Sequence, residues 1–283
     1  MYQATSVIEL RQYIQHWKNH GKSIAFIPTM GNLHQGHISL IEKGQSLCDH
    51  TICSIFVNPM QFGPNEDFNH YPRTLERDID QLEAIGCDLV YLPAASELYP
   101  DGLEKITQVQ VTDLTGVFEG AHRPGHFTGV ATIVLKLLNI VRPDVSIFGK
   151  KDFQQYRVIS KMVEDLNLEV DIIGAETTRE PNGLATSSRN QYLSADQKEL
   201  ASLIYRTLRE SAASITAGEN TFSKLEQRAI ERLNQAGFET DYFCVCNVET
   251  LEPASPEDRS LVILVTARLG ETRLLDNIEI DLG

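Results

Sequence analysis

Short apolar runs alternate with amphipathic segments through the first two-thirds of the chain. The runs are nearly continuous, which is typical of strands buried on both faces of a parallel sheet. We expect these strands at 24–27, 52–57, 89–92, 145–148 and 170–173. The spacing of apolar residues between them predicts helices at 38–47, 75–85, 129–141 and 153–166. Strands that alternate with helices predict an α/β fold with a Rossmann-like parallel sheet.

The pattern changes in the last third of the chain, where a smaller second domain is predicted. A turn-rich stretch at 179–183 marks the change. Beyond it, strands are expected at 239–248 and 260–268, and they favour a small antiparallel sheet. We therefore predict a Rossmann-like domain at 1–176 and a small α+β C-terminal domain at 177–283.

Capping residues predict two helices in this second domain. Ser194 and Gln197 have the spacing of a capping box, so a long helix is expected to run to about Thr216. Ser223 and Glu226 repeat that spacing and predict a second capped helix.

The composition is that of an ordinary globular enzyme. Of the 283 residues, 42% are hydrophobic and 23% are charged. The net charge of −14 argues against nucleic acid as a partner, so an anionic substrate would need a local basic site. The odd number of cysteines suits a reducing cytoplasm better than a disulfide framework. Cys244 and Cys246 alternate along a predicted strand, which favours packed strand residues over a redox pair.

No membrane partner and no export signal are predicted. The N-terminal stretch 1–6 lacks a basic region followed by an apolar core. The most apolar window, 129–141, is too short to span a bilayer and is interrupted by Lys136 and Asn139.

The stretch His34-Gln35-Gly36-His37 is the most informative chemical signal in the chain. It separates a predicted buried strand from a predicted helix, and Gly31 and Gly36 allow the backbone to pass close to a ligand. A helix N-terminus offers N–H groups to phosphate, and an imidazole can donate to a phosphate oxygen as negative charge develops. The pattern resembles the HxGH motif of the nucleotidyl-transfer superfamily, which shares a nucleotide-binding fold with class I aminoacyl-tRNA synthetases.

Other interpretations of the two histidines stay open. They can also cap a helix or bind a metal, although no zinc-type pattern of Cys or His occurs with them. Gly31 and Gly36 have P-loop spacing, but His37 and Ile38 stand where Lys and Ser or Thr are needed.

The residues of most chemical interest cluster where three of the predicted strands end. They are Thr29 and Met30, the stretch 58–61 and the stretch 149–152. Because ligands of parallel sheets bind beyond the carboxyl ends of the strands, we expect one site at this edge.

With these segments in hand, the whole chain resembles the pantothenate synthetase (pantoate–β-alanine ligase) family. The matching stretches keep the same order across most of the chain, at 27–37, 54–62, 71–74, 119–127, 148–155 and 187–190. The resemblance implies that ATP and pantoate form a pantoyl-adenylate and pyrophosphate, and that β-alanine then displaces AMP to give pantothenate. It also implies Mg²⁺ with the ATP, a C-terminal lid that keeps water from the reactive anhydride, and a homodimer.

The resemblance assigns roles to individual residues. His34, His37 and Lys151 match catalytic positions, and Gln61 and Gln155 match pantoate ligands. The positions that match ATP contacts are Met30, Gly31, Asn32, Leu33, His34, Gln35, Gly36, His37, Gly149, Lys150, Lys151, Asp152, Thr178, Thr186, Ser187, Ser188 and Arg189. Amide groups that donate and accept suit pantoate, and cationic side chains suit phosphate.

Local sequence alone also allows simpler interpretations. Asp78 is a candidate for a role near magnesium, but a carboxylate on an exposed helix is usually only solvated. Without the resemblance, Gln155 would be interpreted as a plain surface residue on a helix. The stretch 150–152 would be a charged helix start, and the stretch 187–189 a polar turn.

Three positions depart from the family pattern. Lys150 stands where Glu is more common, Thr128 where Arg is expected, and Thr186 where Leu or Met is common. They leave local details such as nucleotide affinity open.

Two other functions are also considered. One is a different adenylyl or cytidylyl transferase of the HxGH group, which gives no reason for Gln61 and Gln155. The other is a nucleotide-binding regulatory module without turnover.

Overall fold

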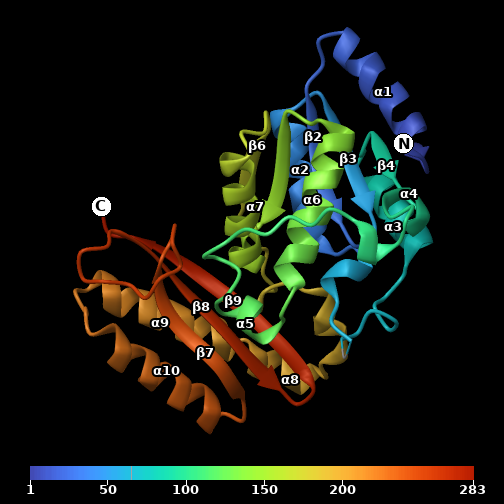
Figure 1. Cartoon of the computed structure of the whole chain (residues 1–283). Coiled ribbons are helices and arrows are strands. Elements are labelled where there is room, and N and C mark those ends of the chain that lie inside the picture. The colour runs from blue at the N-terminus through green and yellow to red at the C-terminus, as the bar shows by residue number, and fades with distance from the viewer. Residues whose placement is uncertain (65) are drawn as a thin grey trace. The chain divides into compact units, whose positions relative to one another are not determined.

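The computed structural model describes every residue of the chain except residue 65, and the chain divides into two units (Figure 1). The first unit holds Met1–Lys150 and Gln155–Glu176, and the second holds Lys151–Gln154 and Thr177–Gly283. A parallel sheet organises the first unit, and an antiparallel sheet organises the second.

Within the described residues, the first unit contains a six-stranded parallel sheet with the strand order β1-β4-β3-β2-β5-β6. Its strands are β1 (Tyr2–Ala4), β2 (Ile24–Thr29), β3 (His50–Ile55), β4 (Leu89–Tyr91), β5 (Val145–Gly149) and β6 (Asp171–Ala175). All five strands expected from the apolar runs are present, which confirms the predicted fold class. The strand β1 was not expected, because it is short and two of its three residues are exposed.

The strand order creates a switch point beside β2. The strands β3 and β4 extend the sheet on one side of β2, and β5 and β6 extend it on the other. Because all these strands are parallel, the residues that follow β2, β3 and β5 gather at one carboxyl edge, where ligands bind in sheets of this kind.

Helices cover both faces of this sheet, with α2 behind it and α6 in front of it (Figure 1). The helices that begin in this part of the chain are α1 (Val7–Asn19), α2 (Gln35–Leu47), α3 (Leu75–Ala84), α4 (Ala95–Leu98), α5 (Glu119–His122), α6 (His126–Val141) and α7 (Phe153–Asp165). The four helices expected between the strands are therefore confirmed.

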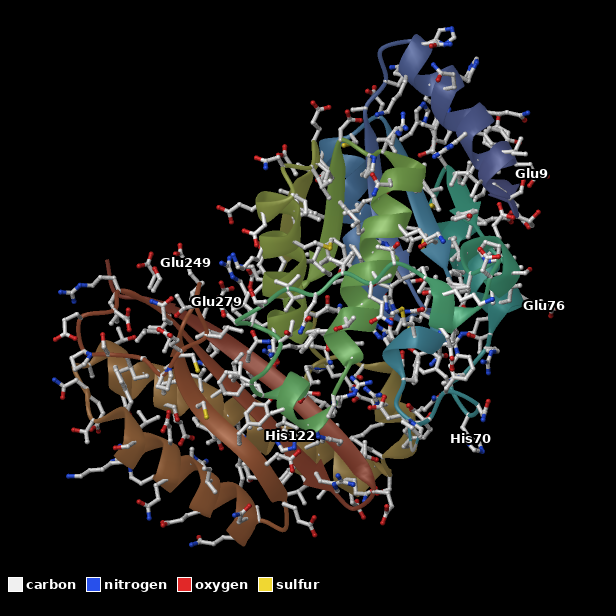
Figure 2. The ribbon with its side chains drawn as sticks, viewed as in Figure 1. Glu9, His70, Glu76, His122, Glu249 and Glu279 are labelled. Carbon is white, nitrogen blue, oxygen red and sulfur yellow. The ribbon has the colours of Figure 1, made fainter. Side chains whose placement is uncertain are left out.

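The helix α1 was not expected, although its sequence contains a capping signal. The Ser6 Oγ accepts a hydrogen bond from the Glu9 N–H at 3.3 Å, and the Glu9 carboxylate accepts one from the Ser6 N–H at 3.2 Å. Figure 2 shows Glu9 at this helix start. Leu10, Ile14 and Trp17 form the buried stripe of the helix.

Within the described residues, the second unit contains a sheet of three antiparallel strands in the order β7-β8-β9. The elements of this unit are β7 (Glu239–Asn247), β8 (Ser260–Leu269), β9 (Thr272–Asp281), α8 (Ala195–Ala201), α9 (Leu203–Thr216) and α10 (Phe222–Gln235). Alternate residues of β8, including Leu261, Ile263 and Val265, share one core with the helices. This is the expected α+β architecture, but β9 was not expected because charged residues interrupt its apolar pattern.

The long helix expected from Ser194 to Thr216 is wrong, because two helices occupy this stretch. The capping box of Ser194 and Gln197 is confirmed. However, α8 ends and α9 begins at Ser202, whose hydroxyl donates to the Glu199 carbonyl at 2.6 Å. A serine hydroxyl that bonds back to a helix carbonyl competes with the backbone ladder and favours a break.

The second predicted capping box is also wrong. The helix α10 begins at Phe222 after Thr221, and no side-chain cap closes this end. The Glu226 carboxylate instead accepts a hydrogen bond from the Val245 N–H of β7 at 2.7 Å. A tertiary contact has therefore taken the side chain that the local pattern assigned to the cap.

Two further observations concern the cysteines and the membrane. All five cysteines are free thiols, and Cys244 and Cys246 lie on β7 as expected. None of the helices in the described part of the chain has the length and apolar character needed to cross a bilayer.

Candidate active site

The loop between β2 and α2 is tightly wound and packed against its neighbours. Gly31 and Asn32 both have positive φ angles, 78° and 50°. A Cβ at Gly31 would lie 2.9 Å from Ile55 Cγ2 and 3.0 Å from Asp78 Oδ2. Only glycine fits here without displacing the strand and the carboxylate beside it.

Asp78 holds this loop from α3. Its Oδ2 accepts a hydrogen bond from the Asn32 N–H and its Oδ1 one from the Leu33 N–H, both at 2.8 Å, and the Thr74 hydroxyl donates to Oδ1 at 3.1 Å. The side chain is 1% exposed, whereas the sequence indicated a solvated carboxylate on an exposed helix. Hydrogen bonds to an ionised carboxylate are among the strong ones, so Asp78 is an anchor of the loop. Its role near magnesium stays a prediction.

His34 and His37 cap the helix α2 with their own imidazoles. The Gly36 N–H donates to His34 Nδ1 at 3.2 Å, and the His34 N–H donates to His37 Nδ1 at 3.3 Å. The ring centroids are 4.0 Å apart. An Nδ1 that accepts a hydrogen bond carries no hydrogen, so in each neutral ring the hydrogen lies on Nε2. Helix capping and phosphate binding are therefore compatible, because they use opposite sides of each ring.

Gln61 lies in a 3-10 turn, Pro59–Gln61, that follows β3. Its Oε1 accepts a hydrogen bond from Asn58 Nδ2 at 3.1 Å, and its Nε2 lies 3.3 Å from Met30 Sδ. The residue is 8% exposed. The amide group is thus held in one orientation beside the start of the β2–α2 loop.

A second network holds the backbone of Gln61. His126 Nδ1 lies 2.8 Å from the Gln61 carbonyl oxygen, and its Nε2 lies 3.1 Å from Arg123 Nη1. Because Arg123 can only donate, Nε2 accepts and Nδ1–H donates to Gln61. Burial, reinforced by the Arg123 charge, lowers the pKa of His126 to about 4, so the ring is neutral near pH 7.

Glu66 completes this network from the far side of Arg123. Its carboxylate accepts two hydrogen bonds from the guanidinium, at 2.8 and 2.5 Å. Burial favours the neutral acid, but Arg123 outweighs it and holds the pKa of Glu66 below its usual value. No sequence pattern pointed to these contacts, because Gln61 and His126 are 65 positions apart.

The remaining predicted residues of the first unit follow β5. Gly149 ends that strand, and Lys150 Nζ pairs with Glu176 Oε1 at 3.0 Å. Gln155 lies in the first turn of α7 and is half-buried. The predicted residues of this unit thus follow β2, β3 and β5, as the carboxyl-edge expectation requires.

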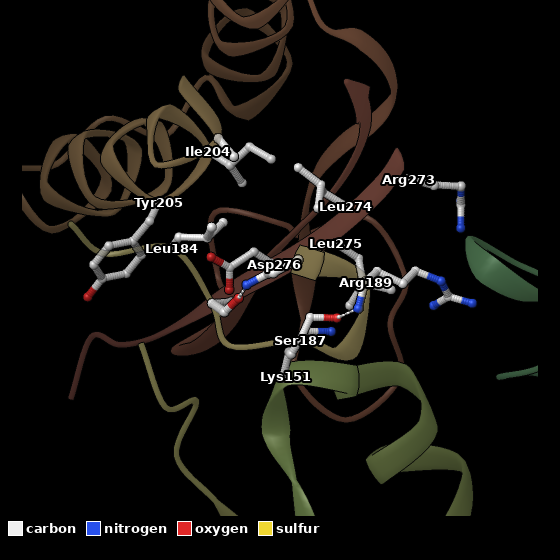
Figure 3. Close-up of a pocket in the computed structure, with 13 residues that line it drawn as sticks. Lys151, Leu184, Ser187, Arg189, Ile204, Tyr205, Arg273, Leu274, Leu275 and Asp276 are labelled. Atoms are coloured by element: carbon white, nitrogen blue, oxygen red, sulfur yellow. Dashed lines mark hydrogen bonds between the residues drawn. The ribbon is translucent and has the colours of Figure 1, made fainter. Parts of the chain in front are cut away.

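Lys151, Ser187 and Arg189 line one pocket of the second unit (Figure 3). Ser187 caps the 3-10 helix Ser188–Tyr192 by accepting a hydrogen bond from the Arg189 N–H at 3.3 Å. Lys151 Nζ lies 3.6 Å from Asp152 Oδ1. Arg273 lines the pocket as well, so the pocket brings together a hydroxyl and three cationic side chains, a combination suited to phosphate.

Asp276 and Asn277 of β9 support this pocket. Two guanidinium nitrogens of Arg179 contact the Asp276 carboxylate at 2.6 and 2.9 Å, and the same guanidinium stacks on the Tyr205 ring with its Cζ 3.5 Å from the centroid. Asn277 Nδ2 donates to the Lys151 carbonyl oxygen at 2.9 Å. β9, which the sequence analysis missed, thus fixes the backbone of a predicted catalytic residue.

Thr178 and Thr186 lie on a short antiparallel ladder next to the same pocket. The Thr186 N–H donates to the Thr178 carbonyl at 2.9 Å, and Arg179 and Ala185 form a bridge. The ladder fixes the chain before and after the turn that leads to Ser187.

The described residues contain no group of three or more His, Cys, Asp or Glu side chains arranged to hold a metal ion. Magnesium commonly binds through substrate phosphates with only one or two protein carboxylates, so it needs no such group.

Comparison with known proteins gives a consistent picture. The sequence model of the family described as pantoate-beta-alanine ligase matches residues 3–279. A pantothenate synthetase of Hahella chejuensis is 51% identical over 277 residues, covering 98% of each chain, and one of Shewanella loihica is 50% identical over 281 residues, covering 99% of each.

Solved structures agree with these sequence relatives. A pantothenate synthetase from Thermus thermophilus matches with a TM-score of 0.91 and 40% identity, over 98% of this chain and 99% of the other. A pantoate-beta-alanine ligase from Francisella tularensis, complexed with beta-gamma ATP and beta-alanine, matches with a TM-score of 0.79 and 34% identity, over 98% and 97%.

Proposed function

The chain belongs to the pantoate–β-alanine ligase family and is an amide-forming ligase that makes pantothenate, and on that premise we propose how it uses ATP. A carboxylate oxygen of pantoate attacks the α-phosphorus of ATP, the bond to the bridging oxygen breaks, and pyrophosphate leaves. The amine of β-alanine then attacks the acyl carbon of the pantoyl-adenylate, AMP departs, and the amine loses a proton. The Francisella relative, complexed with beta-gamma ATP and beta-alanine, supports two of the three substrates.

The capping geometry of His34 and His37 is the observation that carries this proposal. Both imidazoles use Nδ1 to cap α2, so each has its hydrogen on Nε2. Such N–H donors at a helix N-terminus suit phosphate oxygens whose negative charge grows as pyrophosphate departs. We assign the acid role to His37. The surrounding loop, from Met30 to His37, would bind ATP through its backbone.

The pocket of the second unit would bind the same class of groups. Lys151 and Arg189 would neutralise phosphate charge, and the Ser187 and Ser188 hydroxyls would add hydrogen bonds. Thr178 and Thr186 would position this segment, and Gly149, Lys150 and Asp152 would contact ATP where the chain passes from β5 into α7. Magnesium would arrive as MgATP, a form that fits the small number of carboxylates near the loop.

Gln61 and Gln155 would bind pantoate. Gln61 is held at the carboxyl edge of the sheet by Asn58 and by His126, which suits a residue that must recognise a small ligand in one orientation. Replacing either glutamine by Ala should raise the pantoate requirement more than the ATP requirement.

A homodimer and a cytoplasmic location also belong to the proposal. They rest on the family resemblance and on the free cysteines. Sedimentation equilibrium of the purified chain would test the dimer directly.

Exchange of labelled pyrophosphate into ATP tests the adenylate. We expect exchange when pantoate is present and β-alanine is absent, and AMP release only when both are present. Exchange that strictly requires β-alanine would rule out a separate adenylation step. Nucleotide transfer without any amide product would favour a different HxGH transferase, and nucleotide binding without turnover would favour a regulatory module.

A further inference from the structure

The orientation of the Gln61 amide decides what this residue can recognise. If Oε1 faces the ligand, Gln61 accepts hydrogen bonds; if Nε2 faces it, Gln61 donates them. The two orientations have nearly the same shape, so only the hydrogen-bond partners distinguish them.

Asn58, the partner of Gln61, is oriented by two backbone groups. Its Oδ1 accepts a hydrogen bond from the Met60 N–H at 3.3 Å, and its Nδ2 donates to the Gly129 carbonyl at 3.2 Å. A backbone N–H can only donate and a carbonyl can only accept, so the amide of Asn58 is assigned without ambiguity. Gly129 allows this contact, because a Cβ there would lie 2.5 Å from the Met60 carbonyl oxygen.

Tyr99 adds a third contact that points the same way. Its hydroxyl lies 2.5 Å from Asn58 Oδ1, and because that oxygen carries no hydrogen, the hydroxyl is the donor. Burial raises the pKa of Tyr99 to about 12, so the donor proton is retained across the physiological range. Tyr99 directly follows α4, and its ring packs near Phe56. Lys136 Nζ lies 5.6 Å from the centroid of the Tyr99 ring.

These contacts determine the amide of Gln61. Asn58 Nδ2 faces Gln61 at 3.1 Å as a donor, so the atom it meets is the acceptor Oε1. Gln61 Nε2 therefore lies on the other side, against Met30 Sδ at 3.3 Å. A thioether is a weak acceptor, and an oxygen of a ligand would replace it favourably.

We propose that Tyr99 is a positioning residue that acts through Asn58 to hold Gln61 with its N–H groups, and not its carbonyl oxygen, toward pantoate. This inference rests on the proposed role of Gln61 in pantoate binding. In this orientation, Gln61 would donate a hydrogen bond to an acceptor oxygen of the substrate. Tyr99 itself touches no substrate in this scheme.

The test is a double-mutant cycle of Tyr99→Phe and Gln61→Ala. Pantoate is varied at saturating ATP and β-alanine, and ATP is varied at saturating pantoate. Tyr99→Phe should raise the pantoate KM by about 3- to 10-fold, the range expected for one lost hydrogen bond, with kcat and the ATP KM nearly unchanged. In the Gln61→Ala background the same substitution should change the pantoate KM by less than about twofold.

Tyr91→Phe is the matched control. Tyr91 is also buried, but its hydroxyl has no hydrogen-bond partner among the described residues, so its removal should leave all three parameters unchanged. Thermal melts of every variant show whether the fold is retained.

Gln61→Glu tests the orientation independently of Tyr99. If Gln61 presents a donor, the substitution removes it and should impair pantoate binding at least as much as Gln61→Ala does. If the Gln61→Glu variant bound pantoate as tightly as the unmodified chain, position 61 would be an acceptor and the proposal would be wrong.

The remaining outcomes separate this inference from the proposed function. A pantoate KM that is unchanged in Gln61→Ala removes Gln61 from pantoate binding, and the Tyr99 relay with it. Two outcomes would reject the relay alone, provided that Gln61→Ala raises the pantoate KM. One is that Tyr99→Phe has the same effect on this KM in both backgrounds, and the other is that it has no effect in the unmodified chain. In both cases the pantoate role of Gln61 stands.

Discussion

Asp78 in the first unit and Asp276 in the second are both buried, but their carboxyl groups have different kinds of hydrogen-bond partner. The described partners of Asp78 are neutral: two backbone N–H groups of the loop and the Thr74 hydroxyl. Asp276 instead faces the Arg179 guanidinium through two contacts. Neutral donors fix the path of a backbone, whereas the ion pair ties a cationic side chain to a strand.

The same contrast extends through the two candidate regions. The first unit positions His34, His37 and Gln61 with uncharged hydrogen bonds, so its site depends on orientation. The second unit gathers Lys151 and Arg189, so its site depends on charge.

The largest effect is expected from Asp276→Asn. This change leaves the Arg179 charge partly buried without its counterion, and breaking such a pair typically costs about 3–5 kcal/mol. Urea unfolding measures the change in free energy. Asp165→Asn is the control, because its exposed pair with Lys161 is screened by solvent and should contribute little to stability. Equal losses in the two variants would remove the distinction between the regions.

In the proposed mechanism His37 and Lys151 each donate to growing negative charge, so His37→Ala and Lys151→Ala should each lower the adenylation rate by about 10²–10³. Single-turnover formation of the pantoyl-adenylate measures the rate, and thermal melts monitor the fold. Only Lys151→Ala should also weaken ATP binding, since its charge meets the phosphates of the ground state.

His16→Ala and Lys161→Ala serve as controls for that experiment, because neither residue belongs to the candidate site: His16 lies on α1, and Lys161 lies in the second half of α7, beyond Gln155. A near-normal rate in folded His37→Ala would remove this histidine from the mechanism.

His126 should make the stability of the protein depend on pH. Its folded pKa of about 4 lies below its ordinary value of 6.5, so the unfolded chain binds more protons between these values. Stability from this residue is therefore present above about pH 6.5 and is lost as the pH falls toward 4, by on the order of 3 kcal/mol. His126→Asn, which keeps a donor for the Gln61 carbonyl, should flatten the profile; a slope identical to that of the unmodified chain would contradict the assignment.

The smallest effect is expected from Asp78→Asn. The amide keeps one acceptor oxygen but turns an NH₂ group toward a backbone N–H, which should cost about 1–3 kcal/mol. Because the loop shifts, ATP binding should weaken as well. Titrations of ATP alongside urea unfolding would detect both changes, and a loss as large as that of Asp276→Asn would mean that neutral partners and ion pairs act alike here.

Much of the fold could be predicted from hydrophobic periodicity. The five expected strands and the helices between them were found because the strands contain short apolar runs, and four of them, β2 to β5, are largely buried. The expected burial of the fifth, β6, is wrong, because its residues are exposed or half-buried. β1 and β9 were missed, since one is short and exposed and the other carries charges that tertiary contacts stabilise. Local capping rules failed at Ser202 and Glu226, where a hydroxyl and a strand N–H compete for the groups involved.

The candidate site was predictable only as a set of residue types at strand ends. Their roles remain predictions, whereas their supports are now visible. Tyr99 and Asn58 are 41 positions apart, and Asn58 and Gly129 are 71 apart, so no local pattern links them. The burial of Asp78 was missed for the same reason, because the backbone N–H groups that it binds belong to another element.

The histidine cap of α2 has a consequence for protein engineering. Histidine is not among the residues preferred at a helix N-cap, and Ser, Asp or Asn would stabilise such an end better. A search for heat-resistant variants would therefore tend to replace His34, improving the scaffold while discarding a residue assigned to catalysis. If His34 has the proposed catalytic role, stability and turnover conflict at this one position, and selection for either alone would move the sequence in a different direction.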